Sequence, residues 1–340
     1  MKKINQVVCV GPGLLELQKS TYPERQPGEA LLKIERVGIC GTDLHAYGGN
    51  QPFFTYPRIL GHELAAQVVE IDDNPQNIRI GDRVAVIPYK NCENCAACGS
   101  GKPNCCENIQ VFGVHQDGGM REFVCLPVRF LISVTDLSLE EIALIEPLAI
   151  CMHALERSQT KASDNVVVIG CGPIGIGIIK LAMQRGANVV ALDSNPQRVA
   201  FAQNVLGINH VYTLENNVLM RCRSKFGGDL ASIVFDATGN RQAMERGHQY
   251  MRHGGSYVLV GLFKGDLSFS HPEIHAKETS LLCSRNATKD DFLAVIDYLK
   301  SGVFPVSSFI TNRIHASQIS EEMKAITSGK LQVMKAMMHF

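Results

Sequence analysis

A glycine-rich loop between an apolar run and a helical pattern is the feature that most constrains the fold of this chain. Residues 166–169 are Val-Val-Val-Ile, a run typical of a strand buried on both faces of a parallel sheet. The loop Gly170-Cys171-Gly172-Pro173-Ile174-Gly175 follows directly, and a helical pattern extends from Pro173 to about Arg185. This order of strand, tight loop and helix predicts the start of a strand–helix–strand unit.

Strand-like and helix-like segments keep alternating after this unit. The clearest further strands are residues 189–192, 232–235, 257–260 and 280–283. Strands that alternate with helices predict a doubly wound parallel sheet, so we expect this part of the chain to be of the α/β class.

The first 145 residues have a different pattern, in which short apolar segments are separated by turns. Residues 30–34, 65–71 and 83–87 are the clearest strands, and this part of the chain is mostly β. A good helical pattern returns at residues 290–301. With 340 residues, two domains are expected. We therefore expect the α/β domain to be inserted between two parts of a β-rich domain.

The composition excludes several classes of protein. The 33 basic and 33 acidic residues balance, so we expect no nucleic-acid partner and no binding to an anionic membrane surface. The sequence contains no run of 18 apolar residues, so no membrane span is predicted. The N-terminal residues lack the apolar run of a signal peptide, and we therefore expect a cytoplasmic protein. Disulfides rarely persist there, so the crowding of five of the twelve cysteines into residues 92–106 indicates a metal site.

The glycine loop has the spacing of a dinucleotide-binding motif, and each glycine is required there for a different physical reason. Gly170 permits the tight turn, Gly172 lets a pyrophosphate approach the backbone, and Gly175 lets helix and strand pack closely. The helix that begins with Pro173 and Ile174 offers unpaired N–H groups and a partial positive charge to the phosphates. The alternative is a glycine-rich packing turn without a ligand.

An acidic residue at the end of the second strand favours the dinucleotide hypothesis. Asp193 stands where a carboxylate would bind the adenosine ribose, and it would repel the extra phosphate of NADP by about 4 kcal/mol, so NAD is the expected cofactor. Arg198 either reaches the same ribose or is a solvated helix residue. Thr238, Gly239 and Gly261 follow later strands at the expected cofactor edge, although each glycine could serve only a turn.

Four cysteines form the most specific motif of the sequence. Cys92, Cys95, Cys98 and Cys106 come from one short segment and can surround a tetrahedral zinc. An iron–sulfur cluster is less favoured by this spacing, and Cys105 could replace Cys106. Because four thiolates leave no open coordination position, we expect this zinc to be structural.

A second set of ligand types lies elsewhere in the chain. Cys40 and the pair His62-Glu63 stand beside glycines at predicted strand ends, and three such ligands with an open position are typical of a catalytic zinc. Taken singly, Cys40 could be a small buried apolar residue and Glu63 a solvated one. Glu146 is a carboxylate in an apolar segment, and we expect it to be a fourth or exchangeable ligand.

Taken together, these motifs resemble the medium-chain zinc dehydrogenase family over essentially the whole chain. The resemblance implies a GroES-like catalytic domain at 1–148 and 283–340, with the structural zinc lobe at 90–108, and a Rossmann NAD-binding domain at 149–282. It also implies NAD as cofactor, two zinc ions per subunit, and a homodimer or homotetramer. The family's relay hydroxyl corresponds to Thr42, and His45 would carry the substrate's proton towards solvent, unless it is only a structural hydrogen-bonding residue.

The acidic ligands resemble those of the polyol branch of the family. Glu146 stands where ordinary alcohol dehydrogenases have a cysteine, while Ala46 replaces a tyrosine that binds substrate in sorbitol dehydrogenase. Four segments resemble the bacterial dehydrogenases that oxidise L-galactonate, L-gulonate or L-idonate at C5. These are 49–54, 113–119 with His115, 261–265, and 284–288.

The resemblance implies the oxidation of a secondary hydroxyl of a sugar acid or polyol to a ketone. It makes Arg285, Asn286 and His115 the candidate substrate residues. Arg285 and Asn286 would bind the substrate carboxylate, and Arg285 could instead face the cofactor. Direct binding of Glu146 would make the zinc site net negative, so we expect Glu146 to be displaced or to act through water during turnover. The alternatives are a simple alcohol, 2,3-diol or sorbitol-type dehydrogenase, and a non-catalytic NAD- and zinc-binding sensor or structural protein.

Overall fold

The computed structural model describes residues 2–51, 54–215 and 217–340. The chain divides into two compact units, one formed by Met1–Glu146 with Thr288–Phe340 and the other by Pro147–Ala287. The C-terminal segment thus belongs to the same unit as the N-terminal segment. In the part of the chain that is described, no helix is long and apolar enough to cross a membrane.

The first unit is built mainly from strands. Its strands are β1 (Lys3–Gly11), β2 (Leu14–Thr21), β3 (Glu29–Ile39), β4 (Arg58–Ile59), β5 (Glu63–Glu70), β6 (Arg83–Val86), β7 (Tyr89–Lys90), β8 (Gln110–Val111), β9 (Phe123–Pro127), β10 (Leu131–Ser133), β17 (Ile310–His315) and β18 (Lys335–His339). Its helices are α1 (Gly41–Tyr47), α2 (Ala96–Gly99), α9 (Lys289–Lys300), α10 (Val306–Phe309) and α11 (Ile319–Thr327), and α3 (Leu139–Arg157) begins in this unit. Short 3-10 turns occur at Pro103–Cys105, Val128–Phe130 and Ala316–Gln318.

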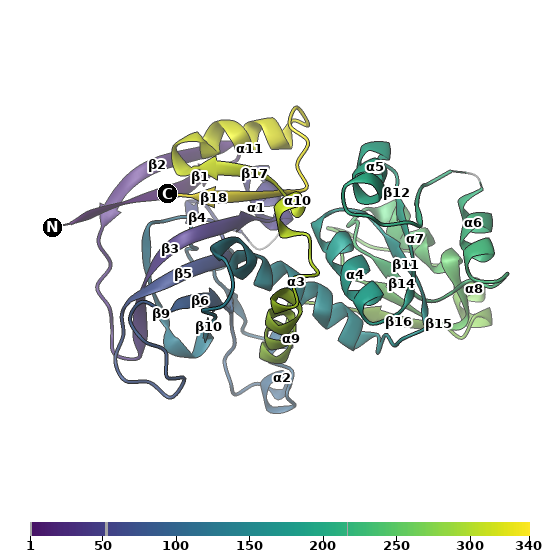
Figure 1. Cartoon of the computed structure of the whole chain (residues 1–340), viewed down its shortest axis with the longest axis horizontal. Helices are drawn as coiled ribbons and strands as arrows, with labels where there is room; N and C mark the ends of the chain where they lie inside the picture. The colour runs from purple at the N-terminus through teal and green to yellow at the C-terminus, as the bar shows by residue number, and fades with distance from the viewer. Residues whose placement is uncertain (1, 52–53, 216) are drawn as a thin grey trace. The chain divides into compact units, whose positions relative to one another are not determined.

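A seven-stranded sheet organises this unit, and β3 lies in its middle. The strand order is β10-β6-β5-β3-β18-β17, with β9 also paired to β3. Figure 1 shows the C-terminal strands β17 and β18, in yellow, beside the purple strand β3. Gly38 near the end of β3 pairs with Glu63 on one side and with Met337 on the other. Residues from three distant segments therefore meet at this end of the sheet.

The second unit contains one six-stranded sheet with the order β13-β12-β11-β14-β15-β16. Every pairing in it is parallel. The strands are β11 (Asn165–Ile169), β12 (Asn188–Asp193), β13 (Val211–Thr213), β14 (Ala231–Asp236), β15 (Met251–Leu259) and β16 (Ser280–Cys283). The helices are α4 (Pro173–Gln184), α5 (Pro196–Asn204), α6 (Val218–Lys225), α7 (Arg241–Arg246) and α8 (His271–Ala276), with a 3-10 turn at Gly247–Tyr250.

This sheet confirms the predicted doubly wound α/β fold. The β-branched side chains of β11 are buried, as expected for a strand covered on both faces. Strand order reverses at β11, which pairs with β12 on one side and β14 on the other. In such sheets ligands bind beyond the carboxyl ends of the strands at this reversal, where the glycine loop lies.

Candidate active site and cofactor pocket

Three metal-ligating side chains meet at the end of the β3–β5 pair. One ligand atom each from Cys40, His62 and Glu63 lies within 4.8 Å of the others. Cys40 follows β3 directly and forms the N-cap of α1, while Glu63 begins β5. Because β3 and β5 are antiparallel neighbours, the end of one strand lies beside the start of the other. We call Cys40, His62 and Glu63 the metal cluster.

Asp43 holds the two segments of the metal cluster together, and the sequence analysis had assigned it no role. Its carboxylate accepts hydrogen bonds from the N–H of Cys40 at 2.9 Å and from the N–H of Gly61 at 3.2 Å. Its Oδ1 also lies 3.9 Å from Nδ1 of His62. Burial raises the pKa of this fully buried carboxyl. A carboxylate behind a histidine is the usual way in which proteins orient a metal-binding imidazole.

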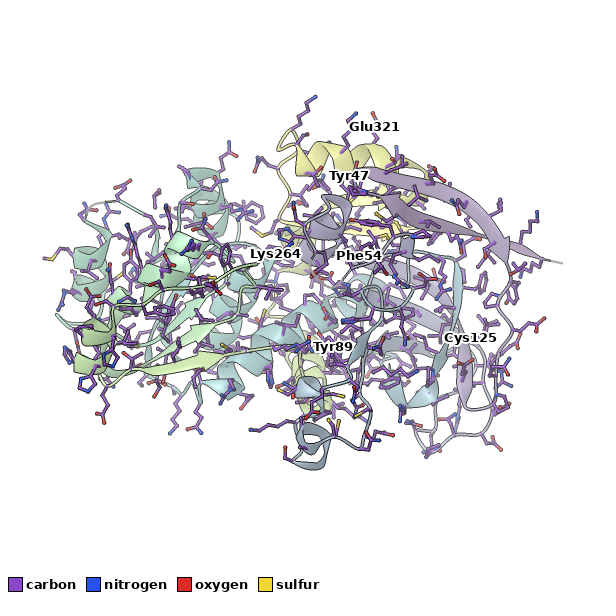
Figure 2. The ribbon with its side chains drawn as sticks, turned by 180° about the vertical axis from the view of Figure 1, so that it is seen from behind. Tyr47, Phe54, Tyr89, Cys125, Lys264 and Glu321 are labelled. Carbon is purple, nitrogen blue, oxygen red and sulfur yellow. The ribbon has the colours of Figure 1, made fainter. Side chains whose placement is uncertain are left out.

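Glu146 faces the metal cluster from α3, but it is not one of the three clustered ligands. Its Oε1 accepts a hydrogen bond from the Tyr89 hydroxyl, and its buried Oε2 has no hydrogen-bond partner among the described residues. Burial, together with the negative charge of Glu63, raises the pKa of Glu146 to about 7. Tyr89, labelled in Figure 2, therefore lies beside the helix that carries Glu146. No pattern in the sequence pointed to this tyrosine.

Lys335 is a further group that the sequence analysis had missed. It begins β18, is only 2% exposed, and forms an ion pair with the Glu63 carboxylate. Its ammonium group also donates a hydrogen bond of 3.1 Å to the carbonyl of Ile39. Burial alone would lower the pKa of Lys335, but the negative charges of Glu63 and Cys40 raise it. In the sequence this lysine stands alone in the apolar segment 334–338, and that pattern could have identified it as a buried charge.

The metal cluster has the chemistry of a zinc site. Its donors are a thiolate, an imidazole and a carboxylate, the ligand types that zinc prefers. His62 and Glu63 are buried, and the free Oε2 of Glu146 is a buried oxygen that still needs a partner. Buried polar atoms are costly unless paired or bound to metal, so these residues fit a zinc ion.

The second set of cysteines also comes together. The sulfurs of Cys92, Cys95, Cys98 and Cys106 lie within 4.8 Å of one another. The N–H of Cys92 points to the sulfur of Cys106 at 3.2 Å, and Cys105 is exposed and outside the group. Hydrogen bonds from the backbone, first that of Asn94, lower the pKa of the Cys92 thiol to about 6. Burial raises the pKa of the Cys106 thiol to about 11, so the lowered pKa favours the metal-binding thiolate at Cys92 and not throughout the group.

The glycine loop has the close contacts that each glycine was predicted to permit. Gly170 has φ of +99°, a left-handed conformation that favours glycine. A side chain on Gly175 would collide with the carbonyl of Gly170, and Gly172 is the N-cap of α4. Pro173 and Ile174 form the first turn of that helix.

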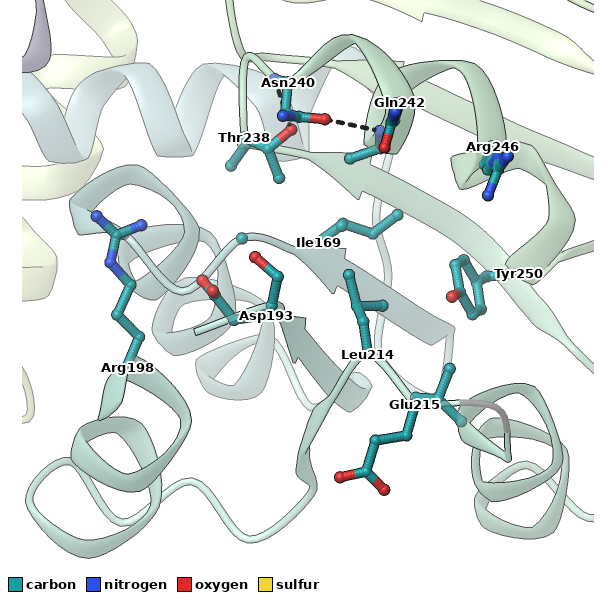
Figure 3. Close-up of a pocket in the computed structure, with 16 residues that line it drawn as sticks. Ile169, Asp193, Arg198, Leu214, Glu215, Thr238, Asn240, Gln242, Arg246 and Tyr250 are labelled. Carbon is teal, nitrogen blue, oxygen red and sulfur yellow. Dashed lines mark hydrogen bonds between the residues drawn. The ribbon is translucent and has the colours of Figure 1, made fainter. Parts of the chain in front are cut away.

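A cavity of about 600 Å³ lies beside this loop. Figure 3 shows Arg198 at one end of it, Tyr250 at the other, and Asp193 between them. The Asp193 carboxylate accepts two hydrogen bonds of 2.7 Å, from the N–H of Cys171 and from that of Asn195. Of the predicted residues, the cavity is lined by Gly170, Gly172, Asp193, Arg198 and Thr238. It is also lined by residues that the sequence analysis had not singled out, among them Glu215, Asn240, Gln242, Arg246 and Tyr250.

Gly239 and Gly261 belong to the packing of two loops and are not among the residues lining this cavity. A side chain on Gly261 would collide with the backbone N of Gly239, and one on Gly239 would come within 2.8 Å of the carbonyl oxygen of Leu262. Both glycines therefore permit the close approach of the segments that follow β14 and β15. This geometry favours the turn interpretation that the sequence had left open.

The remaining predicted residues lie in several places. Thr42 and His45 are three residues apart on α1, which places them on one face of this helix, and His45 is exposed. His115 accepts a hydrogen bond of 3.0 Å at Nδ1 from the N–H of Val111, which stabilises its own turn.

The two residues proposed for the substrate carboxylate follow β16 in the second unit. Arg285 is exposed, and Asn286 has a left-handed backbone conformation. Pro52 and Phe53 of the segment 49–54 lie outside the described residues.

Comparisons with known proteins identify the family. Residues 26–136 match the alcohol dehydrogenase GroES-like domain, and residues 173–301 match the zinc-binding dehydrogenase domain. The chain is 41% identical to the L-galactonate-5-dehydrogenase of Escherichia coli K12 over 340 residues, the full length of both chains. It is 30% identical to the erythritol/L-threitol dehydrogenase of Mycolicibacterium smegmatis, covering 98% of this chain and 96% of that protein.

A solved structure agrees with this result. The short chain alcohol dehydrogenase of Escherichia coli CFT073, determined in complex with NADH, superposes with a TM-score of 0.91 at 25% identity and covers 100% of both chains. The protein belongs to the family of medium-chain zinc-binding dehydrogenases, and it is an NAD-dependent oxidoreductase. Both the resemblance seen in the motifs and the predicted combination of a GroES-like domain with a Rossmann sheet are confirmed.

Proposed function

We propose that this dehydrogenase oxidises a secondary hydroxyl of a sugar acid or polyol to a ketone and transfers the hydride to NAD. The observation that carries the proposal is the metal cluster, which brings together one thiolate, one imidazole and one carboxylate. The carboxylate of Glu146 faces this cluster. The similarity to L-galactonate-5-dehydrogenase supports a sugar acid as the substrate.

The residues of the metal cluster would act through zinc. A zinc ion held by Cys40, His62 and Glu63 would supply Lewis acidity, which lowers the pKa of a substrate hydroxyl. Asp43 orients His62, and Lys335 orients Glu63. The free Oε2 of Glu146 offers an acceptor on the same side of the site, and the Tyr89 hydroxyl holds its other oxygen. In our proposal Glu146 reaches the metal through water or not at all during turnover.

A proton must leave the substrate hydroxyl before the hydride can leave its carbon. Thr42 and His45 on α1 form the proposed path, since they share one face of the helix and His45 is exposed. A histidine suits the outer position because an imidazole can both accept and donate a proton. Thr42 would accept the substrate's proton and pass its own to His45.

The cofactor pocket favours NAD over NADP. The two oxygens of Asp193 are each held by a backbone N–H, so the carboxylate is fixed in the cavity beside the glycine loop. A ribose can donate its 2′-hydroxyl to this carboxylate, whereas a 2′-phosphate about 4 Å away would meet a repulsion of about 4 kcal/mol.

Three further assignments belong to the proposal. Arg285 and Asn286 would bind the carboxylate of a sugar acid. The four-cysteine group would hold a structural zinc, because it leaves no open position. Among the described residues, β16 pairs on one side only, with β15, and Leu281 on it is 45% exposed. This free, partly apolar edge supports self-association into a homodimer or homotetramer.

The experiment is a substrate panel followed by NADH absorbance. The panel contains L-galactonate, L-gulonate, L-idonate, sorbitol and 2,3-butanediol, each assayed with NAD, with and without a chelator. We expect at least one aldonate to be oxidised in a zinc-dependent reaction, and we expect an aldonate to have the highest kcat/KM in the panel. A preference for 2,3-butanediol would indicate a simple diol dehydrogenase, and no zinc-dependent oxidation of any compound would contradict the proposal.

A further inference from the structure

Lys335 is a buried cation in contact with a proposed metal ligand. Its side chain is almost fully enclosed, and among the described residues its ammonium group contacts the Glu63 carboxylate and the Ile39 carbonyl. Ile39 is the last residue of β3 and directly precedes Cys40. One ammonium group therefore touches both segments that supply the metal cluster.

The sheet explains how this contact forms. Lys335 begins β18 and Glu63 begins β5, and β3 lies between these two strands. Strands that are second neighbours lie about 10 Å apart, so the two side chains must cross β3 to meet. They can do so because Gly38 lies between them: a Cβ on Gly38 would collide with Oε2 of Glu63. The glycine thus leaves the space in which the ion pair forms.

The charges of the site give the ion pair a consequence for metal binding. Cys40 as thiolate, Glu63 and Glu146 can contribute three negative charges, and His62 contributes none when neutral. A zinc ion supplies two positive charges, and Lys335 supplies the third. The Lys335 ammonium is paired with the buried Glu63 carboxylate, which without this partner would carry an uncompensated charge whenever no metal is bound.

We propose that Lys335 is an internal counter-cation of the metal centre, a positioning residue that holds Glu63 when zinc is absent and weakens zinc binding by repulsion when it is present. The inference rests on the proposed zinc site. Removing one positive charge makes the field at the cluster more negative, and a dication entering that field binds more tightly. The metal-free protein loses the partner of Glu63 at the same time.

The test compares variants that separate charge from hydrogen bonding. Lys335→Met removes both, Lys335→Gln removes the charge but keeps a donor for Ile39, and Lys335→Arg keeps the charge. Lys277→Met is the matched control, because Lys277 donates to the carbonyls of His248 and Met251 in the other unit. Each protein is prepared in two forms, one with two zinc ions per chain and one from which the more labile zinc has been removed. Thermal unfolding is recorded for both forms.

We expect the two neutral variants to lose more thermal stability in the form lacking the labile zinc than in the zinc-loaded form. Lys335→Arg should behave like the wild type, and Lys277→Met should lower both forms equally. A neutral variant that folds only when loaded would be the extreme form of the expected result. Equal losses in both forms would overturn the counter-cation role.

Zinc retention is the second readout, and it does not depend on catalysis. Zinc content is measured after dialysis against graded chelator, with the zinc of the four-cysteine group as the internal reference. Lys335→Met and Lys335→Gln should retain the second zinc about tenfold more tightly than the wild type. Unchanged or weaker retention would overturn the proposal while leaving the dehydrogenase assignment intact. A wild-type chain that binds only one zinc would contradict the proposed function itself, and the role of Lys335 with it.

Discussion

The carboxylate of Glu63 occupies the space that a side chain on Gly38 would fill. The two residues pair across the antiparallel strands β5 and β3, and a Cβ on Gly38 would collide with the carboxylate oxygen Oε2. The metal cluster therefore depends on a position that has no side chain.

Gly38→Ala should displace Glu63 and weaken zinc binding at the metal cluster. We expect loss of the second zinc per chain and at least a tenfold lower kcat, with a stability cost of about 1–3 kcal/mol for the overpacked site. Zinc content and thermal unfolding measure both effects. Gly11→Ala is the control, because a Cβ at Gly11 meets no atom of the described residues within 4 Å. Full zinc content in Gly38→Ala would show that the site tolerates the displacement.

Asp43→Asn should loosen the metal cluster without changing its ligands. The amide keeps the shape of the side chain but can accept only one of the two backbone hydrogen bonds, from Cys40 and Gly61, that the carboxylate accepts. Leaving a buried donor unpaired costs about 1–3 kcal/mol, and the second zinc should dissociate more readily. Asp72→Asn, in the exposed pair with Arg25, should change the stability little, because solvent screens exposed ion pairs. Equal effects of the two substitutions would remove the special role of Asp43.

Glu146→Gln should lower kcat by about tenfold or more and leave the zinc content at two per chain. The amide lacks the negative charge that Glu146 can present to the site, while Cys40, His62 and Glu63 remain as ligands. The control is Glu156→Gln, which changes an exposed carboxylate on the same helix. If Glu146→Gln keeps the wild-type kcat and KM, Glu146 has no part in turnover.

Asp193→Ser should reduce the preference for NAD over NADP by about 100-fold, because the 2′-phosphate no longer meets a fixed carboxylate. The ratio of kcat/KM for the two cofactors is the measurement. Glu215→Gln, which also removes a carboxylate from the lining of the cavity, should change this ratio little. A ratio that stays the same in Asp193→Ser would place the discrimination elsewhere.

Cys106→Ser and Cys105→Ser are neighbouring substitutions with opposite expectations. Cys106 lies in the four-cysteine group, whereas Cys105 is exposed and outside it. Cys106→Ser should therefore lose the chelator-resistant zinc and several degrees of Tm, and Cys105→Ser should change neither. Reversed results would mean that the zinc is held by Cys105.

The sequence pattern was sufficient to predict those parts of the protein that depend on local order. The β-branched run 166–169, the glycine loop and the following helix are encoded by neighbours in the chain, and β11 and α4 lie within a residue of their predicted bounds. The ligand types around Cys40 and His62 were also recognisable, because cysteine and histidine beside glycines at strand ends have few other uses.

Contacts between distant segments could not be predicted in the same way. Lys335 reaches Glu63 only because β18 lies beside β3, and no local pattern specifies that strand order. Tyr89 meets Glu146 across two segments that show no sequence relationship. Gly239 and Gly261 follow strands at the cofactor edge of the sheet, but their packing against each other became evident only from the loop geometry.

The catalytic role of the metal cluster is tested most directly by NADH formation from L-galactonate, measured as a function of the zinc content of the same sample. The labile zinc is removed in steps with chelator and then restored, and metal analysis is made at each step. We predict a rate that rises in proportion to the second zinc per chain and vanishes when only the zinc of the four-cysteine group remains. A rate that is unchanged at one zinc per chain would contradict the assignment of Cys40, His62 and Glu63 as the catalytic metal site.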